Sequence, residues 1–467
     1  MKLALIGGGG VRTPLFTQSV AKYAQRLGIT ELSIMDIDQE KLHIYGSLAK
    51  YLASGDNPDL KVVFTTNFKE AVTGADYVVT TLRVGGDQGR IFDERIALCN
   101  GALGQETTGA GGFSFAIRTI PVMLEYCKII KEVSNHAIIF NFTNPSGLVT
   151  QAMHINGYDN VIGICDGPTQ LKSEIAGSLH ISINDIAARI YGLNHLSWLD
   201  SARVNGVEIL DKLISYDAFL ENSKEFSHFD KDIIRMNHSI PSGYLYYYYY
   251  RERAVRNILS SPQTRGETVK AINDAMLKKL KDIDPVGNPE EALKAYHEFI
   301  DERESSYMSI EVGHKVRDKE EIDVSSFGVG EIAVLEKSEE IYEGYSGVAF
   351  NFIEAVKNNK PTEIPLNVPN NGAIGALEDG DVVEISCIVD NNGAKPMKIK
   401  NPDTDNLLLI KQVKRYEMLT VEAVMNRSKE LALRALMVHP LIGSYDLSKK
   451  LVESYLFTFR DYLGEWK

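Results

Sequence analysis

Short apolar runs alternate with amphipathic stretches over the first third of the chain. Each run is three to five residues long, and the stretches between them, such as 48–52 and 120–133, place apolar residues at helical spacing. Strands that alternate with helices are typical of a doubly wound, mainly parallel α/β sheet. The strands predicted in this way lie at residues 2–6, 32–35, 62–64, 77–80, 137–140 and 161–164.

The later part of the chain has a different pattern. Residues 202–204 and 207–209, joined by Asn205-Gly206, predict a hairpin, and a second strand pair is expected from 382–387 and the region of Met397. Apolar positions in the last sixty residues predict helices packed on the core. We therefore expect an N-terminal sheet domain, residues 1–195, and a C-terminal mixed α+β domain, residues 196–467.

The glycine-rich turn after the first strand is typical of dinucleotide binding in a Rossmann-like sheet. Glycines let the backbone approach a pyrophosphate, whose charge is stabilised by the amides and dipole of the following helix N-terminus. The turn departs from the full GxGxxG pattern, because Arg12 or Thr13 stands where the third glycine belongs. The residues expected to contact the cofactor here are Gly7, Gly8, Gly9, Gly10, Val11 and Arg12.

The second predicted strand ends at Asp36, about where such a sheet presents an acid to a ribose diol. An acid at this position favours NAD over its phosphorylated relative. The alternative is that Asp36 only caps the following helix. Thr81 and Asn141 follow later strands, and we expect them near the cofactor because ligands bind beyond the carboxyl ends of the strands.

Polar loops between the strands supply candidate binding groups. The glycine-rich stretch 104–112 is long enough for an active-site lid, and the alternative is a solvated surface turn. Asn144 could bind a substrate hydroxyl or satisfy its own turn. Arg265 could bind an anion with both arms of its guanidinium, or form a plain surface ion pair.

A thiol and an imidazole form the third candidate group. Cys165 ends the strand predicted at 161–164, and His195 follows thirty residues later. Both are competent ligands for a transition metal, and two protein ligands would leave coordination positions open. The alternatives are a small core cysteine and a histidine that satisfies a local hydrogen bond.

Seven residues from Tyr244 to Tyr250 include six tyrosines. So many phenols cannot all face one core, and in a helix at least one hydroxyl could point into a cleft. The alternative is an aromatic interface between subunits or domains, which would account for most of them.

Composition limits the function classes. The 467 residues exceed one ordinary core, no apolar run approaches the roughly 20 residues that span a bilayer, and the net charge of −13 opposes nucleic acid and anionic lipid as partners. An anionic substrate would need a local basic pocket. The four cysteines are widely spaced and Met1 leads directly into the first strand, so we expect a cytoplasmic protein with free thiols.

Several separate motifs in fixed order resemble glycoside hydrolase family 4, whose members use NAD and a divalent metal. Within that family the chain looks most like members that act on 6-phosphorylated glucosides. The resemblance implies an architecture similar to that of lactate and malate dehydrogenases, and a homodimer or homotetramer. The motifs are MDID, RVGG, GQETTGAGGF, NFTNPSG, ICDGP, YGLNHLSW, TRGE, NNGAI and MLTVEAVMNRSKELALRALMVHPL.

The resemblance also implies roles for individual residues. Cys165 and His195 correspond to the metal ligands, usually of manganese, and Tyr244 to the base, with Tyr246 or Tyr247 as alternatives within the tyrosine run. The remaining substrate contacts that it implies are Arg90, Asn144 and Arg265 to the phosphate and hydroxyls, and Glu106 near cofactor and substrate.

The family mechanism explains why these residue types occur together. NAD removes hydride from carbon 3 of the sugar, the metal stabilises the enolate, and Tyr244 takes the carbon 2 proton. Elimination of the aglycone, addition of water and return of the hydride complete the cycle. A phenol has a pKa of about 10, so nearby cations must help it act as a base near neutral pH.

The motifs disagree about the anomer. Asp166, directly after the metal-binding cysteine, resembles the general acid of members that act on 6-phospho-α-glucosides, or else it orients the metal ligands. GQETTGAGGF, NFTNPSG and the segment 241–245 look more like the β-type members, and Gly167 departs from both groups. We therefore expect a 6-phospho-β-glucosidase. The alternatives are a 6-phospho-α-glucosidase, an NAD-dependent hydroxyacid dehydrogenase and a non-catalytic nucleotide-responsive regulator.

Overall fold

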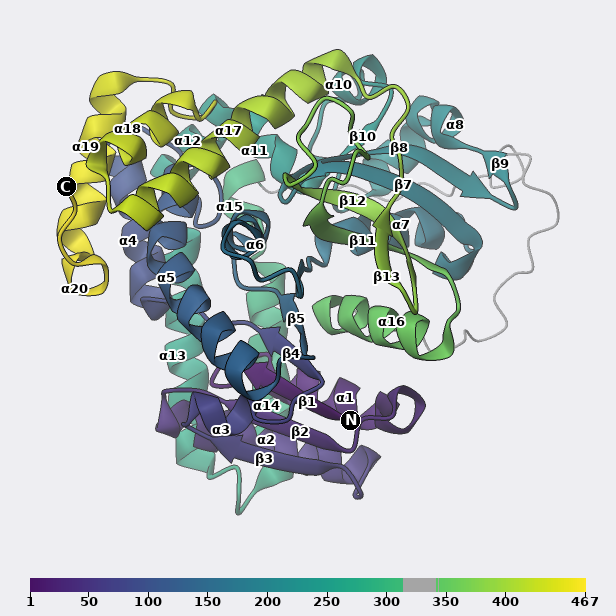
Figure 1. Cartoon of the computed structure of the whole chain (residues 1–467), viewed down its shortest axis with the longest axis vertical. Helices are drawn as coiled ribbons and strands as arrows, with labels where there is room; N and C mark the ends of the chain where they lie inside the picture. The colour runs from purple at the N-terminus through teal and green to yellow at the C-terminus, as the bar shows by residue number, and fades with distance from the viewer. Residues whose placement is uncertain (314–341, 343) are drawn as a thin grey trace. The chain divides into compact units, whose positions relative to one another are not determined.

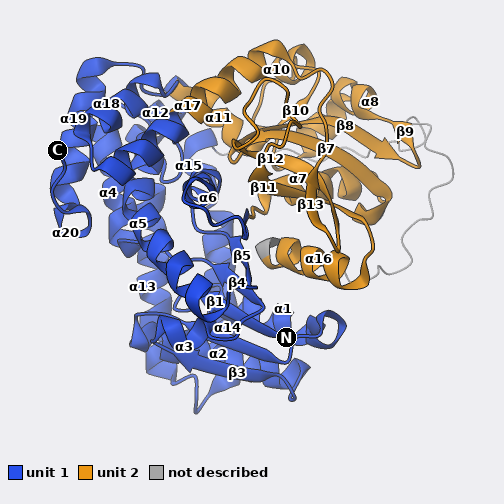
Figure 2. Cartoon of the chain, in the orientation of Figure 1, with its two compact units in different colours: residues 1–162, 252–313, 416–467 blue, residues 163–251, 314–415 orange. Residues whose placement is uncertain are grey.

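A computed structural model describes residues 1–313, 342 and 344–467 (Figure 1). These residues form two compact units, each built from separate stretches of chain (Figure 2). Unit 1 comprises residues 1–162, 252–313 and 416–467, and unit 2 comprises 163–251 and 314–415, of which 342 and 344–415 are described. The domain boundary that the sequence suggested between residues 195 and 196 stays a prediction.

Unit 1 contains the doubly wound sheet predicted from the sequence. Its strand order is β6-β5-β4-β1-β2-β3, and the pairings from β5 to β3 are parallel. The order reverses between β1 and β4, where sheets of this kind bind their ligands. The strands are β1 (Lys2–Ile6), β2 (Glu31–Met35), β3 (Lys61–Thr65), β4 (Tyr77–Thr80), β5 (Ile138–Asn141) and β6 (Val161–Gly163), through which the chain enters unit 2.

The helices of unit 1 follow the amphipathic stretches of the sequence. They are α1 (Thr13–Leu27), α2 (Gln39–Asp56), α3 (Phe68–Val72), α4 (Gly86–Cys99), α5 (Gly109–Val133), α6 (Ser146–Ile155), α13 (Arg265–Ile283), α14 (Pro289–Ser305), α15 (Ser309–Val312), α18 (Lys429–Val438), α19 (Tyr445–Thr458) and α20 (Arg460–Leu463). Two further helices, α12 (Arg251–Ser260) and α17 (Thr404–Asn426), cross the boundaries between the units.

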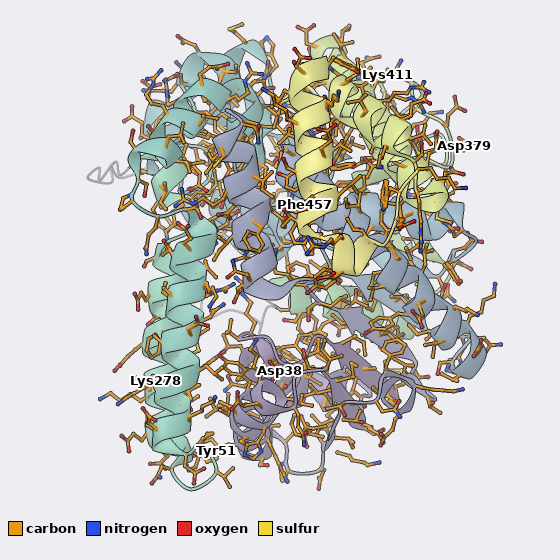
Figure 3. All side chains as sticks on the ribbon, turned by 90° about the vertical axis from the view of Figure 1, so that its left-hand side faces the viewer. Asp38, Tyr51, Lys278, Asp379, Lys411 and Phe457 are labelled. Carbon is orange, nitrogen blue, oxygen red and sulfur yellow. The ribbon has the colours of Figure 1, made fainter. Side chains whose placement is uncertain are left out.

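A cluster of apolar side chains joins α2 to the α13–α14 pair. Tyr45, Met276, Leu280 and Tyr296 are all buried in it, which removes their apolar surface from water. The Tyr296 hydroxyl donates to the backbone carbonyl of Val11 at 2.8 Å, so α14 is tied to the glycine turn. Lys278 lies on the exposed face of α13 (Figure 3).

Unit 2 is built on an antiparallel sheet of order β10-β8-β7-β12-β11. The predicted hairpin is confirmed, with Val204 of β8 opposite Val207 of β9. The second strand pair, expected near Met397, is also present, because β13 pairs with β12 in antiparallel orientation. The strands are β7 (Ile186–Leu193), β8 (Leu196–Val204), β9 (Val207–Glu208), β10 (Ile240–Pro241), β11 (Thr362–Pro369), β12 (Val382–Asp390) and β13 (Gly393–Pro396).

Helices of unit 2 pack against this second sheet. In unit 2, α7 lies against β7, and α16 lies against β11 and β12. The helices are α7 (Gly167–Ser178), α8 (Leu210–Ser215), α9 (Asp217–Asn222), α10 (Lys231–Met236), α11 (Tyr246–Tyr249) and α16 (Gly344–Asn358), with 3₁₀ turns η1 (Ile183–Asp185) and η2 (Gly243–Leu245). The mixed α+β character expected of the later chain is therefore confirmed.

The glycine-rich stretch 104–112 is neither a lid nor a surface turn. Its last glycines open helix α5, and residues 109–112 are all buried. A Cβ atom at Gly111 would lie 2.2 Å from the Gln105 carbonyl oxygen, and one at Gly112 would lie 2.5 Å from that of Thr107. Composition alone suggested a mobile loop, whereas the glycines are needed for close packing. Among the described helices none is long and apolar enough to cross a membrane.

Candidate functional site

The glycine turn between β1 and α1 is held against the end of β2. The amides of Gly7 and Gly8 both donate to the Met35 carbonyl, at 3.0 and 2.8 Å. A Cβ atom at Gly7 would lie 2.8 Å from Thr81, and one at Gly8 would lie 2.2 Å from the Ile34 side chain. Only glycine fits these positions, which leaves the narrow backbone cradle that a dinucleotide needs.

Asp36 lies at the end of β2 and contacts the same turn. Its carboxylate accepts from the Gly9 amide at 2.7 Å and from the Asp38 amide at 2.9 Å. The N-cap of α2 is Asp38, which accepts from the Lys41 amide at 3.1 Å. The capping alternative for Asp36 is therefore wrong, and its place beside the glycine turn fits a ribose contact.

The two polar residues predicted at later strand ends, Thr81 and Asn141, differ in how far their side chains are buried and hydrogen bonded. Thr81 is partly buried and donates to the Ile6 carbonyl at 3.1 Å, directly beside Gly7. Asn141 is fully buried, and its side-chain amide forms four hydrogen bonds, one with Thr80 on β4 and three with residues 143–150 that follow it. The expected cofactor contact of Asn141 stays a prediction, and this bonding gives it no support.

Unit 1 gathers several arginines around Glu106. The Glu106 carboxylate pairs with Arg90 and with Arg83, the latter at 3.4 Å. Burial acts to raise the pKa of Glu106, but the charges of four arginines outweigh it and lower the pKa below its ordinary value. The four are Arg90, Arg83, Arg265 and Arg303. A chain of net charge −13 therefore contains a local basic cluster, which we call the arginine cluster.

Some donors of the arginine cluster find no acceptor among the described residues. Nη1 of Arg83, Nη1 of Arg90 and Nε of Arg303 are buried and donate no hydrogen bond to the described part of the chain. Buried donors are costly when unsatisfied, so their arrangement fits an anion. The sequence pointed to Arg90 and Arg265 but missed Arg83 and Arg303, since single arginines in helices and loops are common.

The first turn of α13 places Arg265. Thr264 and Glu267 form a capping box at this end of the helix. From α4, Arg95 donates two hydrogen bonds to Glu267, at 2.8 and 2.5 Å, and Glu94 accepts from the Gly266 amide at 2.8 Å. Arg265 itself donates to the Ser306 carbonyl and lies over the ring of Tyr307. Asn144, half-buried between β5 and α6, has a predicted role only.

Unit 2 brings Cys165 next to the turn that contains His195. Asn194 and His195 form the two-residue turn of the β7–β8 hairpin, in which Leu193 pairs with Leu196. His195 has a φ of 63°, and the Asn194 side chain hydrogen bonds the Cys165 thiol. The hairpin pattern around residues 194–195 was not recognised in the sequence, although apolar residues flank a short polar pair.

Tyr244 lies beside the imidazole. The rings of His195 and Tyr244 stack at 3.7 Å between centroids, with planes 2° apart. Tyr246 and Tyr247 are buried, whereas Tyr244 is partly exposed. Farther along the run, the Tyr249 hydroxyl bonds Trp198 and Asn237. Of the alternatives left open by the tyrosine run, this packing within unit 2 favours Tyr244 as the available phenol.

Two carboxylates flank the thiol. Asp166 lies 4.0 Å from the Cys165 sulfur, and Glu384 is buried close by. Burial raises the pKa of the Cys165 thiol well above its ordinary value, and the charges of Glu384 and Asp166 raise it further. A bound divalent cation would therefore be needed to stabilise the deprotonated thiolate. The donor set of a thiol and an imidazole fits such an ion, with positions left for other ligands.

Comparison with known families identifies the chain. The family model described as "Family 4 glycosyl hydrolase" matches residues 2–181. A second model, described as "Family 4 glycosyl hydrolase C-terminal domain", matches residues 190–442. The chain belongs to glycosyl hydrolase family 4. The resemblance drawn from its motifs is confirmed, and with it the hydrolase class expected from the sequence.

Individual relatives match over the full length. The 6-phospho-beta-glucosidase BglT of Thermotoga maritima is 32% identical over 99% of both chains. A structure of the 6-phospho-beta glucosidase from the same organism with manganese, NAD⁺ and glucose-6-phosphate is 30% identical over 99% of both chains, with a TM-score of 0.80. A 6-phospho-alpha-glucosidase from gut microorganisms, with NAD and glucose-6-phosphate, is 27% identical over 100% of both chains, with a TM-score of 0.81.

More distant structures bear on the fold alone. A lactate dehydrogenase from a deep-sea metagenome library shares the fold at 15% identity, covering 90% of this chain and 98% of its own, with a TM-score of 0.50. The expected similarity to the lactate and malate dehydrogenase architecture is therefore confirmed.

Proposed function

We propose that this family 4 glycosidase hydrolyses 6-phospho-β-glucosides to glucose 6-phosphate and an aglycone, with NAD and a divalent cation, most simply manganese. The main support is the arginine cluster, in which Arg83, Arg90 and Arg303 keep buried donors that find no acceptor among the described residues, in a chain that is otherwise acidic. The relatives with bound NAD, manganese and glucose-6-phosphate support the same ligands for this chain.

Unit 1 would supply the binding of cofactor and phosphate. The glycine turn would accommodate the pyrophosphate, and Asp36, which accepts from the Gly9 amide, would accept from a ribose hydroxyl. Arg265 and Arg90 would bind the substrate phosphate, since a guanidinium matches its oxygens in charge and geometry. Glu106, which keeps its charge among the arginines, would hold their side chains in place before the anion arrives.

Unit 2 would supply the groups for proton transfer. When bound, NAD⁺ accepts and returns a hydride, and the cation withdraws electrons from neighbouring sugar oxygens. Cys165 and His195 would hold the cation. Tyr244, fixed by its stack on His195, would take the proton from carbon 2. Asp166 would protonate the leaving oxygen, or orient Cys165.

One observation favours the α-anomer instead. Asp166 directly follows Cys165, as in members of the family that act on 6-phospho-α-glucosides, and it lies 4.0 Å from the thiol. The longer motifs and the full-length relative BglT support the β-anomer, so we retain it as the proposal.

A chromogenic assay separates these candidates. Nitrophenyl 6-phospho-β-glucoside, its α-anomer and the unphosphorylated β-glucoside should be compared with NAD⁺ and Mn²⁺ present. The proposal expects the first to be cleaved fastest and the last hardly at all. Preferred cleavage of the α-anomer would replace the proposal by the second candidate, and equal cleavage of the plain glucoside would contradict phosphate recognition.

The expectations of a homodimer or homotetramer and of a cytoplasmic location form part of the same proposal. We expect the substrate to be a phosphorylated disaccharide or glucoside. Sedimentation of the purified protein would test the oligomeric state.

A further inference from the structure

Glu384 is a buried carboxylate of unit 2 that the proposed reaction does not use. It lies on β12 and is 2% exposed. Its Oε1 accepts from the side-chain amides of Asn194 at 3.1 Å and Asn367 at 3.4 Å. Its Oε2 accepts from the hydroxyl of Ser197 at 2.8 Å. Three side chains, one each from β8, β11 and the β7–β8 turn, therefore converge on one carboxylate.

These donors are all neutral. Within residues 1–313, 342 and 344–467, Glu384 forms no ion pair. An ionised carboxylate is costly to bury unless a positive charge lies nearby. Burial raises the pKa of Glu384 above its ordinary value. A cation close to Glu384 would offset the cost of its charged form, and none of the residues that the structure describes supplies one.

Asn194 connects this carboxylate to the proposed metal ligands. Its side chain hydrogen bonds both Glu384 and the Cys165 thiol. It also precedes His195, which is held at a φ of 63° in the same two-residue turn. A change at Glu384 would therefore reach both ligands through one amide.

Glu384 does not complete a set of ligands itself. In the part of the chain that the structure describes, no three His, Cys, Asp or Glu side chains are grouped closely enough to hold a metal ion. Its contribution must come from outside the coordination sphere. Carboxylates in such positions orient metal ligands and raise metal affinity in many proteins.

We propose that Glu384 is a positioning residue for the divalent cation, acting through Asn194 to orient the Cys165 thiol and the His195 turn and adding a negative charge beside them. This inference rests on the proposed role of Cys165 and His195 as metal ligands.

The test measures Mn²⁺ binding by the electron paramagnetic resonance of free Mn²⁺, in the full-length protein without substrate. Glu384→Gln should weaken Mn²⁺ affinity by about 10- to 100-fold, with NAD⁺ affinity and thermal stability close to those of the parent. The matched control is Glu363→Gln, which removes a partly buried carboxylate from β11 of the same sheet and should leave Mn²⁺ affinity unchanged.

A double-mutant cycle tests the route through Asn194. If Glu384 acts through this amide, the variant Asn194→Leu/Glu384→Gln should lose no more Mn²⁺ affinity than the worse single variant. Co²⁺ substitution gives a second readout, because Glu384→Gln should shift the thiolate-to-cobalt absorption band. Additive losses in the cycle together with an unshifted band would overturn the inference.

The outcomes separate this inference from the proposed metal site. If Cys165→Ser keeps parental Mn²⁺ affinity, the ligand set is wrong. If Cys165→Ser loses Mn²⁺ but Glu384→Gln keeps it, the ligands stand and the role of Glu384 is refuted. If Glu384→Gln does not fold, Asn194→Leu alone tests the inference. Unchanged Mn²⁺ affinity in Asn194→Leu would contradict the proposed action of Glu384 through Asn194.

Discussion

At the residue scale, the buried thiol of Cys165 links metal binding to pH. Burial raises the pKa of this thiol well above its ordinary value, so binding a cation must displace a proton. Cys165→Ser should reduce Mn²⁺ affinity at least tenfold and leave NAD⁺ affinity and the melting temperature nearly unchanged. In the parent, Mn²⁺ affinity should rise between pH 6 and pH 8. Calorimetric titration of both proteins at the two pH values checks this, and a flat parental profile would argue against a thiolate ligand.

Arg265 provides a second residue-scale prediction. A charge-assisted hydrogen bond to a phosphate contributes about 1.5–3 kcal/mol, so Arg265→Ala should lower kcat/KM for the 6-phosphoglucoside by about 10- to 100-fold. The plain glucoside should be affected little. Arg265→Lys keeps the charge but not the two-armed geometry, and it should recover only part of the loss. Unchanged discrimination between the two substrates in Arg265→Ala would exclude Arg265 from phosphate recognition.

Glu225 should make stability depend on pH. Burial, and then the charges of Glu174 and Asp166, raise its pKa to about 7, so the folded state binds a proton that the unfolded chain releases near its ordinary pKa. Stability from this group is present at low pH and is lost as pH rises towards 7. Glu225→Gln should therefore raise the melting temperature at pH 8 and leave it nearly unchanged at pH 4.5.

A control of opposite sign comes from Glu208. Burial acts to raise its pKa, but hydrogen bonds from Ser201 and Ala202 outweigh this and lower it. Glu208→Gln should therefore reduce the melting temperature at pH 8. Equal changes in melting temperature for Glu225→Gln at both pH values would show that the pKa of Glu225 is not raised in the folded state.

Individual site residues were predictable where a motif or a strand end marked them. Asp36 follows a strand and a glycine turn, and Cys165 ends a strand, so their placement could be expected. Arg303 and Glu384 could not be, because each reaches its partners from a segment that carries no site motif and is distant from those partners in the sequence.

At the element scale, the N-terminal cap of α13 should affect both the stability of the protein and its substrate preference. Thr264 caps the helix whose first residue is Arg265. Thr264→Ala should cost about 1 kcal/mol of stability and loosen the first turn. It should therefore also reduce the preference for phosphorylated over plain glucoside several-fold, because Arg265 would lose its fixed position.

The matched control for Thr264→Ala is Ser428→Ala. Ser428 caps α18 in the same unit and accepts from the Leu431 amide at 3.3 Å. Its loss should lower stability by a similar amount without changing substrate preference. Equal preference in the two variants, measured by kcat/KM ratios, would show that the cap of α13 has no part in selectivity.

Element prediction succeeded where periodicity was strong and failed where packing decided. The parallel strands and the C-terminal helices were predicted from apolar spacing. The stretch 104–112 was not, because its glycines indicate flexibility in sequence but serve the close approach of α5 to the segment before it. The β7–β8 hairpin was missed because its strands are buried along most of their length, with charged residues such as Arg189 and Asp200 at partly buried positions, so that apolar and polar residues do not alternate regularly.

At the scale of the whole molecule, both units are assembled from separated stretches of chain. The sheet class follows from the alternation of strands and helices, which is a local property. The return of residues 252–313 and 416–467 to unit 1 depends on long-range contacts such as the Tyr455 hydroxyl donating to the Asp93 carbonyl, and local patterns do not reveal these.

The central claim is that a sugar ring is oxidised and restored within one catalytic cycle, so that cofactor and cation are both required and neither is consumed. The direct measurement removes NAD and metal from the purified protein and follows aglycone and NADH together after each is added back. Cleavage should be absent in the stripped protein, return only with both NAD⁺ and Mn²⁺, and produce no net NADH. Full cleavage by the stripped protein, or NADH formed without aglycone release as in a dehydrogenase, would contradict the account.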